Sequence, residues 1–257
     1  MNEILKMIIL GLVQGLTEFL PVSSSGHLIL LQDIFGITEN VLFNTIVLHL
    51  GTLFAVVLYY FKDLTSLLRK ENHKTIWLLI IATIPACVVG LIAGEMIEDI
   101  GTIKLLAFTF LFTAIILIAT TSYNKSLNKW REIDVKTACV MGMCQCIALL
   151  PGVSRSGSTI AGGTFSKSHP KNVTKFSFFM SIPIILGSLI LELFKVNFHG
   201  INWVAILFGL VSSSLSGMLA IKVMTKLAEK CNFKWFGAYL LFLSLLCFTN
   251  EFLVVLW

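Results

Sequence analysis

The sequence predicts an all-α integral membrane protein with six full spans and two re-entrant helix–loop–helix segments, arranged as an inverted-topology repeat. Two observations carry this prediction. The 257-residue chain is 56% hydrophobic and only 13% charged, with a mean hydropathy of +0.89, which lies well outside the composition of soluble domains. In addition, one short polar motif occurs twice, about half a chain apart.

Six apolar runs are long enough to cross a bilayer as helices, which takes roughly 20 residues each. They cover about residues 41–61, 75–94, 103–121, 173–195, 202–222 and 236–257. The N-terminal apolar run leads directly into a polar motif, so we expect no cleavable signal peptide. The six cysteines lie mostly within or beside apolar runs, and we interpret them as small packing residues rather than as metal ligands.

The segments 2–35 and 135–170 differ from these spans because Pro, Gly and several serines interrupt them. Lipid cannot satisfy the open backbone that such residues create. A segment of this kind is stable at membrane depth only where protein buries it or where it lines a wet cavity. Each segment is therefore predicted to enter the membrane, turn and leave on the side from which it came.

One re-entrant segment followed by three spans occurs twice, so we expect a single membrane domain, 1–257, built from a first repeat, 1–121, and a second repeat, 135–257. An odd number of spans in each half turns the second half upside down relative to the first. The basic residues gather in four stretches, which all fall on one side in this arrangement: 62–74, 122–134, 166–175 and 222–234.

Because basic loops face the cytoplasm, the sequence predicts that both termini face outward and that the two re-entrant tips meet near mid-membrane. The stretch 95–102, which carries Glu95, Glu98 and Asp99, and the stretch 196–201 have no basic residue and fall on the other side. The basic residues behind the net charge of +5 then lie in loops at the membrane surface, and we expect no nucleic-acid partner.

The repeated polar motif divides its reactive groups between the two copies. The first copy runs from Gly11 to His27 and the second from Gly142 to Thr159, and adding 131 to a residue number in the first gives its counterpart in the second. Glu18 and His27 occur only in the first copy, whereas Arg155 occurs only in the second. The retained pairs are Gly11 and Gly142, Gln14 and Gln145, Ser23 and Ser154, Ser25 and Ser156, and Gly26 and Gly157. This division predicts one composite site at the interface of the repeats.

Glu18 lies in an otherwise apolar membrane segment, where an ionisable group is costly unless it is paired or hydrated. It follows Gln14 by one helical turn, so both side chains share a helix face. Two oxygen-bearing side chains on one face suit a hard divalent cation or a polarised water. The alternative is a polar pair that holds helices together.

In the first copy of the motif, the hydroxyls of Ser23, Ser24 and Ser25 lie within one turn of chain beside Gly26. Hydroxyls and loop amides can bind phosphate oxygens, and glycine lets the backbone approach closely. His27 is the residue here suited to proton transfer near neutral pH. The alternative is that the serines only begin a helix and that His27 is a packed residue without a chemical role.

Arg155 favours the anion-binding interpretation. It lies between Ser154 and Ser156, next to Gly157, inside a loop at membrane depth, and a guanidinium is the preferred partner of a phosphate or carboxylate. A structural pairing with Glu18 is the alternative, and it too would bring Arg155 to the first motif. That pairing would leave the hydroxyls and glycines without a role, so we expect a bound oxyanion.

Two other polar features are expected to be structural. His49 lies in a span and is interpreted as a packed polar residue rather than as a ligand. Ser212, Ser213, Ser214, Ser216 and Gly217 form a run of small residues. That run is typical of a packing face between membrane helices.

At these motifs, Glu18-Phe-Leu-Pro-Val-Ser-Ser-Ser-Gly-His27 and Pro151-Gly-Val-Ser-Arg-Ser-Gly-Ser-Thr159, the chain resembles the undecaprenyl-diphosphate phosphatases, also called bacitracin-resistance proteins. The resemblance covers the whole chain. It implies hydrolysis of undecaprenyl diphosphate to undecaprenyl phosphate and inorganic phosphate, recycling of the lipid carrier for peptidoglycan synthesis, and bacitracin resistance. It further implies a bacterial cytoplasmic (inner) membrane protein whose active site faces the outer, periplasmic side, and a divalent metal ion, Mg²⁺ or Ca²⁺, as cofactor.

By family position, the resemblance implies that Glu18, Ser24, His27 and Arg155 are catalytic. Ser24 would attack as a nucleophile or position a water, His27 would move the proton, and Glu18 and Gln14 would hold the metal. Some family members have Glu where this chain has Gln14, and an amide cannot act as a base. The substrate phosphates would be bound by Ser23, Ser25, Gly26, Ser154, Ser156, Gly157 and Thr159.

One competing function stays open. Inverted repeats with broken helices are typical of secondary transporters, so a transporter or flippase for a polyprenyl phosphate or another anion is the alternative. A transporter needs binding groups, whereas hydrolysis also needs a proton mover. The expected partners are a polyprenyl diphosphate lipid and the membrane lipids, and a homodimer is one alternative for the assembly.

Overall fold

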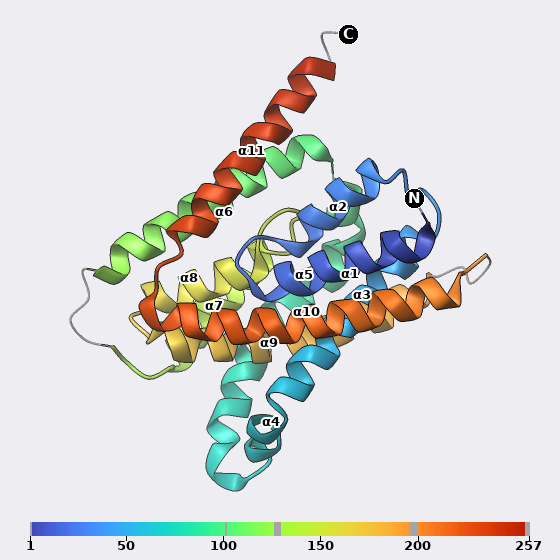
Figure 1. The fold of residues 1–257 in the computed structure, drawn as a ribbon. Helices are drawn as coiled ribbons and strands as arrows, with labels where there is room; N and C mark the ends of the chain where they lie inside the picture. The colour runs from blue at the N-terminus through green and yellow to red at the C-terminus, as the bar shows by residue number, and fades with distance from the viewer. Residues whose placement is uncertain (1, 101, 126–129, 196–199, 255–257) are drawn as a thin grey trace.

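The computed structural model describes residues 2–100, 102–125, 130–195 and 200–254, apart from the side chains of 95, 98, 99, 124, 125 and 250–254. No strand occurs among the described residues, so the all-α prediction is confirmed. The helices are α1 (Glu3–Phe19), α2 (Ser24–Ile34), α3 (Val41–Tyr59), α4 (Phe61–Leu67), the 3₁₀ turn η1 (Lys70–Asn72), α5 (His73–Asp99), α6 (Ile103–Lys125), α7 (Val135–Ile147), α8 (Arg155–Phe165), α9 (Pro170–Leu193), α10 (Trp203–Lys230) and α11 (Lys234–Val254) (Figure 1).

Among the described residues, five helices are long and apolar enough to cross a membrane, which confirms a multi-pass membrane protein: α3, α5, α6, α9 and α10. Several predicted loops are partly helical instead: α4 and η1 lie in the stretch 62–74, and α6 extends into the stretch 122–134 as far as Lys125. The stretch 95–102 belongs to α5 as far as Asp99, and the stretch 222–234 belongs to α10 as far as Lys230. Ala, Lys, Met, Leu and Glu dominate the stretch 222–234 and are strong helix formers, so α10 continues until Cys231 ends it with a φ of 42°.

The helix pattern of the first half recurs in the second half. The bounds of α2 and α8 differ by the same 131 residues as the motif copies, at both ends. The same offset relates α1 to α7, α3 to α9, α5 to α10 and α6 to α11 within a few residues. The duplicated motif therefore lies on a duplicated helix–turn–helix unit, and we call α1–α2 the first hairpin and α7–α8 the second hairpin.

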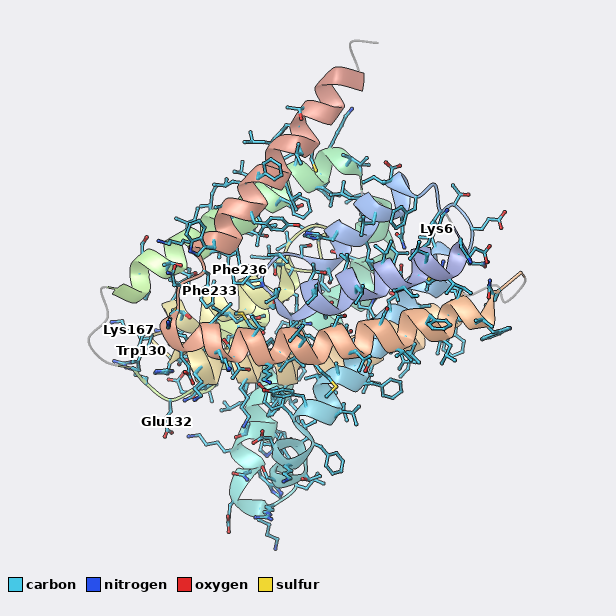
Figure 2. All side chains as sticks on the ribbon, in the orientation of Figure 1. Lys6, Trp130, Glu132, Lys167, Phe233 and Phe236 are labelled. Atoms are coloured by element: carbon cyan, nitrogen blue, oxygen red, sulfur yellow. The ribbon has the colours of Figure 1, made fainter. Side chains whose placement is uncertain are left out.

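Each hairpin closes on itself at its open end. In the first, Lys6 Nζ donates to the carbonyl of Phe35, 2.7 Å away. In the second, the Arg131 amide donates to the Lys167 carbonyl at 2.8 Å. The two open ends lie on opposite sides of the molecule, with Lys6 on one side and Trp130 and Lys167 on the other (Figure 2). The turns of both hairpins meet near the middle of the molecule (Figure 1).

Small residues let the hairpins pack closely on the other half of the chain. A Cβ atom added to Gly15 of α1 would lie 2.6 Å from the Gly217 amide nitrogen of α10, and one added to Gly142 of α7 would lie 2.6 Å from the Ala82 carbonyl oxygen of α5. Ser212 donates to the Ile8 carbonyl at 3.1 Å. The predicted small-residue packing face on α10 is thus confirmed.

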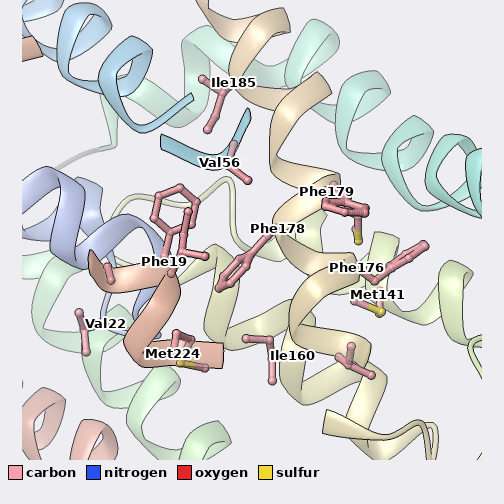
Figure 3. Close-up of a cluster of buried hydrophobic side chains, with 14 of the residues drawn as sticks. Phe19, Val22, Val56, Met141, Ile160, Phe176, Phe178, Phe179, Ile185 and Met224 are labelled. Carbon is pink, nitrogen blue, oxygen red and sulfur yellow. The ribbon is translucent and has the colours of Figure 1, made fainter. Parts of the chain in front are cut away.

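A buried apolar cluster fixes the inner end of α1. Phe19 is fully buried and meets Phe178 of α9 edge to face, with ring centroids 5.2 Å apart. Val56, Ile160 and Met224 surround this pair from α3, α8 and α10 (Figure 3). Because Phe19 directly follows Glu18, the cluster anchors that carboxylate between the two halves.

The described basic stretches gather at one end of the molecule. Lys175 pairs with Asp63 at 2.6 Å, which joins the stretch 166–175 to the stretch 62–74. Lys171 pairs with Glu229 of α10 at 2.7 Å. Of the other calls on the loops, residues 126–129 and 196–199 and the side chains of Glu95, Glu98 and Asp99 lie outside the described part of the chain.

Candidate active site

The turn of the first hairpin follows from its proline. Pro21 has no amide hydrogen and disfavours a helical residue before it, and Leu20 takes the extended backbone expected of that position, with a φ of −74° and a ψ of 147°. Ser23 then caps α2, since its hydroxyl accepts from the Gly26 amide at 3.3 Å. Ser23 has a φ of 68°, which is uncommon for a residue with a side chain.

The turn of the second hairpin is built on glycine and serine. Gly152 has a φ of 87°, a conformation that glycine adopts without strain. Ser154 caps α8 by accepting from the Gly157 amide at 3.0 Å. The two turns touch, because the Gly152 amide donates to the Ser25 hydroxyl at 3.3 Å and the Ser156 hydroxyl donates to the Leu20 carbonyl at 3.0 Å.

Glu18 is the centre of the composite site and is buried, with 7% of its side chain exposed. Its Oε2 atom accepts from Ser24 Oγ at 2.6 Å and from Gln14 Nε2 at 3.1 Å. Its Oε1 atom forms an ion pair with Arg155 Nη2. The structure thus brings together Gln14, Glu18 and Ser24 from the first hairpin with Arg155 from the second, as the division of reactive groups suggested.

Arg155 is held from a third helix as well. Its Nη1 atom donates to the Ser177 carbonyl of α9 at 3.4 Å. Thr159 donates to the Arg155 carbonyl at 2.8 Å and shares a 2.7 Å hydrogen bond with the Ser177 hydroxyl. Within each turn the outer serines also meet, Ser23 with Ser25 at 3.4 Å and Ser154 with Ser156 at 3.3 Å. The hydroxyl of Ser24 and the guanidinium of Arg155 therefore meet on one buried carboxylate, and the other hydroxyls of the two turns surround this contact.

Sequence comparisons place the chain among known proteins. The family profile described as "Bacitracin resistance protein BacA" matches residues 7–246. The chain belongs to this family. It is 38% identical over 243 residues to the undecaprenyl-diphosphatase of Carboxydothermus hydrogenoformans, covering 91% of this chain and 92% of the relative.

Two further relatives match over nearly their whole length. Undecaprenyl-diphosphatase 4 of Bacillus thuringiensis subsp. konkukian is 35% identical over 252 residues, which cover 96% of this chain and 97% of the relative. The undecaprenyl-diphosphatase of Methanobrevibacter smithii is 35% identical over 272 residues, with 97% and 98% covered. The resemblance seen in the two motifs is thus confirmed at the level of the BacA family.

The structure adds side chains to the site that the motifs did not indicate. His49 Nε2 lies 3.8 Å from Glu18 Oε2, although the sequence favoured a packed polar residue there. Ser177 supports Arg155, and Tyr239 of α11 contacts His27. An ionisable residue inside a span is itself a signal of function, and it could have identified His49; Ser177 and Tyr239 carry no such signal.

The hydrogen bonds of His27 go to residues other than those that contact Glu18. Its Nδ1 atom is 2.6 Å from the Ser23 carbonyl oxygen, and its Nε2 atom is 2.7 Å from the Tyr239 hydroxyl. Both ring nitrogens are therefore engaged by groups other than Ser24, Glu18 and Arg155. The nucleophile candidate Ser24 instead donates to Glu18.

Gln14 and Glu18 fit a hard divalent cation as part of a larger ligand set. The Gln14 Oε1 atom is buried and has no hydrogen-bond partner among the described residues, so an acceptor oxygen is free beside the carboxylate. No group of three or more His, Cys, Asp or Glu side chains suited to a metal occurs in the described part of the chain. Mg²⁺ is commonly bound by one or two carboxylates together with substrate phosphates and waters, which matches this limited donor set.

Proposed function

We propose that this BacA-family chain hydrolyses undecaprenyl diphosphate to undecaprenyl phosphate and inorganic phosphate. The observation that carries the proposal is the contact of Ser24 and Arg155 with one buried carboxylate, Glu18, across the two hairpins. A hydroxyl beside a proton acceptor and a permanent cation is an arrangement that suits phosphoryl transfer. The relatives named undecaprenyl-diphosphatase support the choice of substrate.

In the proposed reaction, Ser24 Oγ attacks the terminal phosphorus while its proton passes to Glu18, which already accepts that hydroxyl. The bond from phosphorus to the bridging oxygen breaks, and undecaprenyl phosphate leaves. Water then hydrolyses the phosphoserine and releases phosphate. In the alternative route, Ser24 and Glu18 orient a water that attacks directly.

Charge stabilisation would come from both hairpins. Arg155 would bind the phosphate oxygens, supported by Ser154, Ser156, Gly157 and Thr159 in its own hairpin, by Ser23, Ser25 and Gly26 opposite, and by the amides of the two turns. Glu18 and Gln14 would hold a divalent ion, Mg²⁺ or Ca²⁺, which would neutralise charge on the leaving phosphate. The Glu18 carboxylate would then exchange part of its pairing with Arg155 for the cation.

We also propose that the chain forms one membrane domain of two inverted repeats, 1–121 and 135–257, with α11 as a sixth span. Helices α2 and α8 have 11 residues each, or about 16 Å at 1.5 Å per residue. A bilayer core is roughly 30 Å thick, so neither can cross it. Hairpins that open on opposite sides of the molecule (Figure 2) would then be re-entrant from opposite faces.

The orientation follows from the clustered basic stretches, which would face the cytoplasm. The site would open to the periplasmic side of the bacterial inner membrane. There the enzyme would recycle the carrier lipid for peptidoglycan synthesis and confer bacitracin resistance. In a cysteine-free background, Glu39→Cys should react with an impermeant reagent from outside and Glu71→Cys only from inside. The opposite labelling would overturn this orientation.

Phosphate release from a soluble-tailed polyprenyl diphosphate by the purified protein in detergent tests the activity. We expect release without any membrane gradient, its loss with a chelator, and its return with Mg²⁺ or Ca²⁺. The Arg155→Ala variant should be inactive, whereas Arg69→Ala, which removes an arginine from a surface loop, should match the wild type. A protein that moves the lipid between leaflets of liposomes and never cleaves it would instead be a flippase.

A further inference from the structure

The hydrogen bonds of His27 define the state of its ring. A carbonyl oxygen only accepts hydrogen bonds, so His27 Nδ1 carries the proton that it shares with the Ser23 carbonyl at 2.6 Å. In the neutral ring, Nε2 then holds a lone pair, and it accepts from the Tyr239 hydroxyl at 2.7 Å. Both positions at which His27 could exchange a proton with substrate are therefore occupied.

The ring of His27 also packs against two aromatic side chains. It stacks on Tyr239 of α11 with centroids 5.7 Å apart and planes 19° from parallel. Phe110 of α6 lies against it with centroids 5.8 Å apart. Only 8% of His27 is exposed. The side chain is thus fixed between two helices that are remote in sequence from its own hairpin.

The partner of His27 is the strained residue of the site. Ser23 has a φ of 68° and a ψ of 99°, and a residue with a side chain keeps such a backbone only where its surroundings enforce it. Its carbonyl accepts from the His27 ring and, at 3.4 Å, from the His27 amide. Ser24 follows directly, so the backbone of Ser23 sets the direction in which the Ser24 hydroxyl reaches Glu18.

The second hairpin provides an internal comparison. Ser154, the counterpart of Ser23, has an ordinary φ of −72°. The counterpart of His27 is Ser158, whose buried hydroxyl has no hydrogen-bond partner among the described residues, and the counterpart of Tyr239 is Phe108. The copy that lacks the histidine and the tyrosine thus also lacks a positive φ at the position of Ser23, and the positive φ of its turn falls on Gly152 instead.

We propose that Tyr239 and His27 are positioning residues: together they hold the positive-φ backbone of Ser23 and thereby aim Ser24 at Glu18. This inference rests on the proposed hydrolase function and assigns His27 to support of the nucleophile rather than to proton transfer. Tyr239 acts through His27, and His27 acts through the Ser23 carbonyl.

The variant Tyr239→Phe removes the hydrogen bond and keeps the ring stack. We expect kcat to fall about tenfold, the size of one lost hydrogen bond, with KM unchanged because Arg155 still binds the phosphates. Tyr59→Phe, at an exposed tyrosine of α3, is the matched control and should have no effect. His27→Asn keeps an N–H group close to the position of Nδ1 and cannot titrate, so it should retain far more activity than His27→Ala, with the wild-type pH profile.

A double-mutant cycle with Ser23→Gly decides the mechanism, because glycine adopts a positive φ without enforcement. In the Ser23→Gly background, Tyr239→Phe should lower kcat by less than twofold, and it should lower the unfolding temperature less than in the wild-type background. Equal effects in both backgrounds would overturn the inference, as would a His27→Asn variant that is as inactive as His27→Ala. If the wild type released no phosphate, the proposed function would fail, and the unfolding temperatures of the four proteins would still test the coupling.

Discussion

The two hairpins have the same turn architecture and carry different chemistry. In both, a serine caps the second helix, Ser23 at 3.3 Å from its glycine amide and Ser154 at 3.0 Å. The carboxylate has no such duplicate, since the counterpart of Glu18 is Leu149 and that of Ser24 is Arg155. The shared residues build turns, whereas the unshared residues meet one another. The site therefore exists only where both hairpins are present.

The paired glutamines, Gln14 and Gln145, also differ between the hairpins in their hydrogen bonds. Gln14 and Gln145 are both buried, with 0% and 1% exposed. Gln14 donates to Glu18 and keeps a free acceptor oxygen, while both amide atoms of Gln145 have no hydrogen-bond partner among the described residues. A buried amide is costly without partners, and among the described residues only the glutamine of the first hairpin has one, the carboxylate of Glu18.

The largest expected effect separates the serines of the first turn. Ser24→Ala removes the oxygen that we propose as the nucleophile and should lower kcat by roughly a thousandfold or more. Ser25→Ala and its counterpart Ser156→Ala remove hydroxyls that join the two turns, so they should mainly raise KM, and by similar factors. Kinetics of phosphate release measure all three. Mass spectrometry of a trapped phosphoserine would assign covalent catalysis, and substantial turnover by Ser24→Ala would favour direct attack by water.

The next effect concerns the cation contributed by the second hairpin. Arg155→Ala leaves Glu18 buried without its charge partner and removes the group expected to bind phosphate. By analogy with breaking a buried ion pair, we expect a loss of roughly 3–5 kcal/mol in transition-state stabilisation, measured from kcat/KM. Arg155→Lys should restore little, because a point charge cannot replace the guanidinium fork. Full activity of Arg155→Ala would remove the basis of the composite site.

A smaller effect tests whether both hairpins depend on close helix contacts. Gly15→Ala would place a Cβ atom 2.3 Å from the Ser213 carbonyl oxygen, and Gly142→Ala one 2.6 Å from the Ala82 carbonyl oxygen. Overpacking of this kind costs about 1–3 kcal/mol. Gly187→Ala in α9 is the matched control, because nothing lies within 4 Å of its added Cβ and alanine favours a helix. Thermal unfolding in detergent should rank the variants, and unchanged stability in Gly142→Ala would contradict the contact with α5.

Much of the fold and half of the site could be predicted from sequence. Composition and the length of the apolar runs predicted the long helices. The repeated motif predicted that Glu18 and Arg155 lie close together, because a duplicated pattern relates residues that are far apart in the sequence. The ends of α5 and α10 were predicted too short, since apolarity marks the membrane core while helix propensity continues beyond it. Tyr239 and Ser177 could not be predicted, because only the packing of α11 and α9 brings these neutral residues to the motifs.

The predicted roles of two histidines show the same limit. The motif suggested His27 as the proton mover, but a motif does not specify the tertiary partners that occupy both ring nitrogens. His49 lies outside either motif, and packing of α3 against α1 is what brings it within 3.8 Å of Glu18. The predicted metal ligands and phosphate-binding residues stay predictions, which the chelation and kinetic experiments address.

The smallest effect compares the caps of the first helices of the two hairpins. Asn2 caps α1, where its Oδ1 atom accepts from the Ile4 amide at 3.1 Å, and Asp134 caps α7, where its Oδ1 atom accepts from the Thr137 amide at 2.8 Å. The hydrogen bonds from Thr137 hold the pKa of Asp134 below its usual value of 3.8. A lowered pKa means that this stabilisation is present above pH 3.8 and is lost as the pH falls through the folded-state value.

Asp134→Asn keeps a capping oxygen and removes the charge. At pH 7 the wild type should be slightly more stable than this variant, by a few tenths of a kcal/mol, since Asp134 is exposed and a charge at a helix N-terminus contributes little there. The difference in unfolding temperature should disappear as the pH is lowered below 3.8. Asn2→Ala should cost about 1 kcal/mol and show no such pH dependence, because asparagine does not titrate. An equal difference between the wild type and Asp134→Asn at both pH values would show that the charge on Asp134 does not stabilise α7, and that the two caps differ only in geometry.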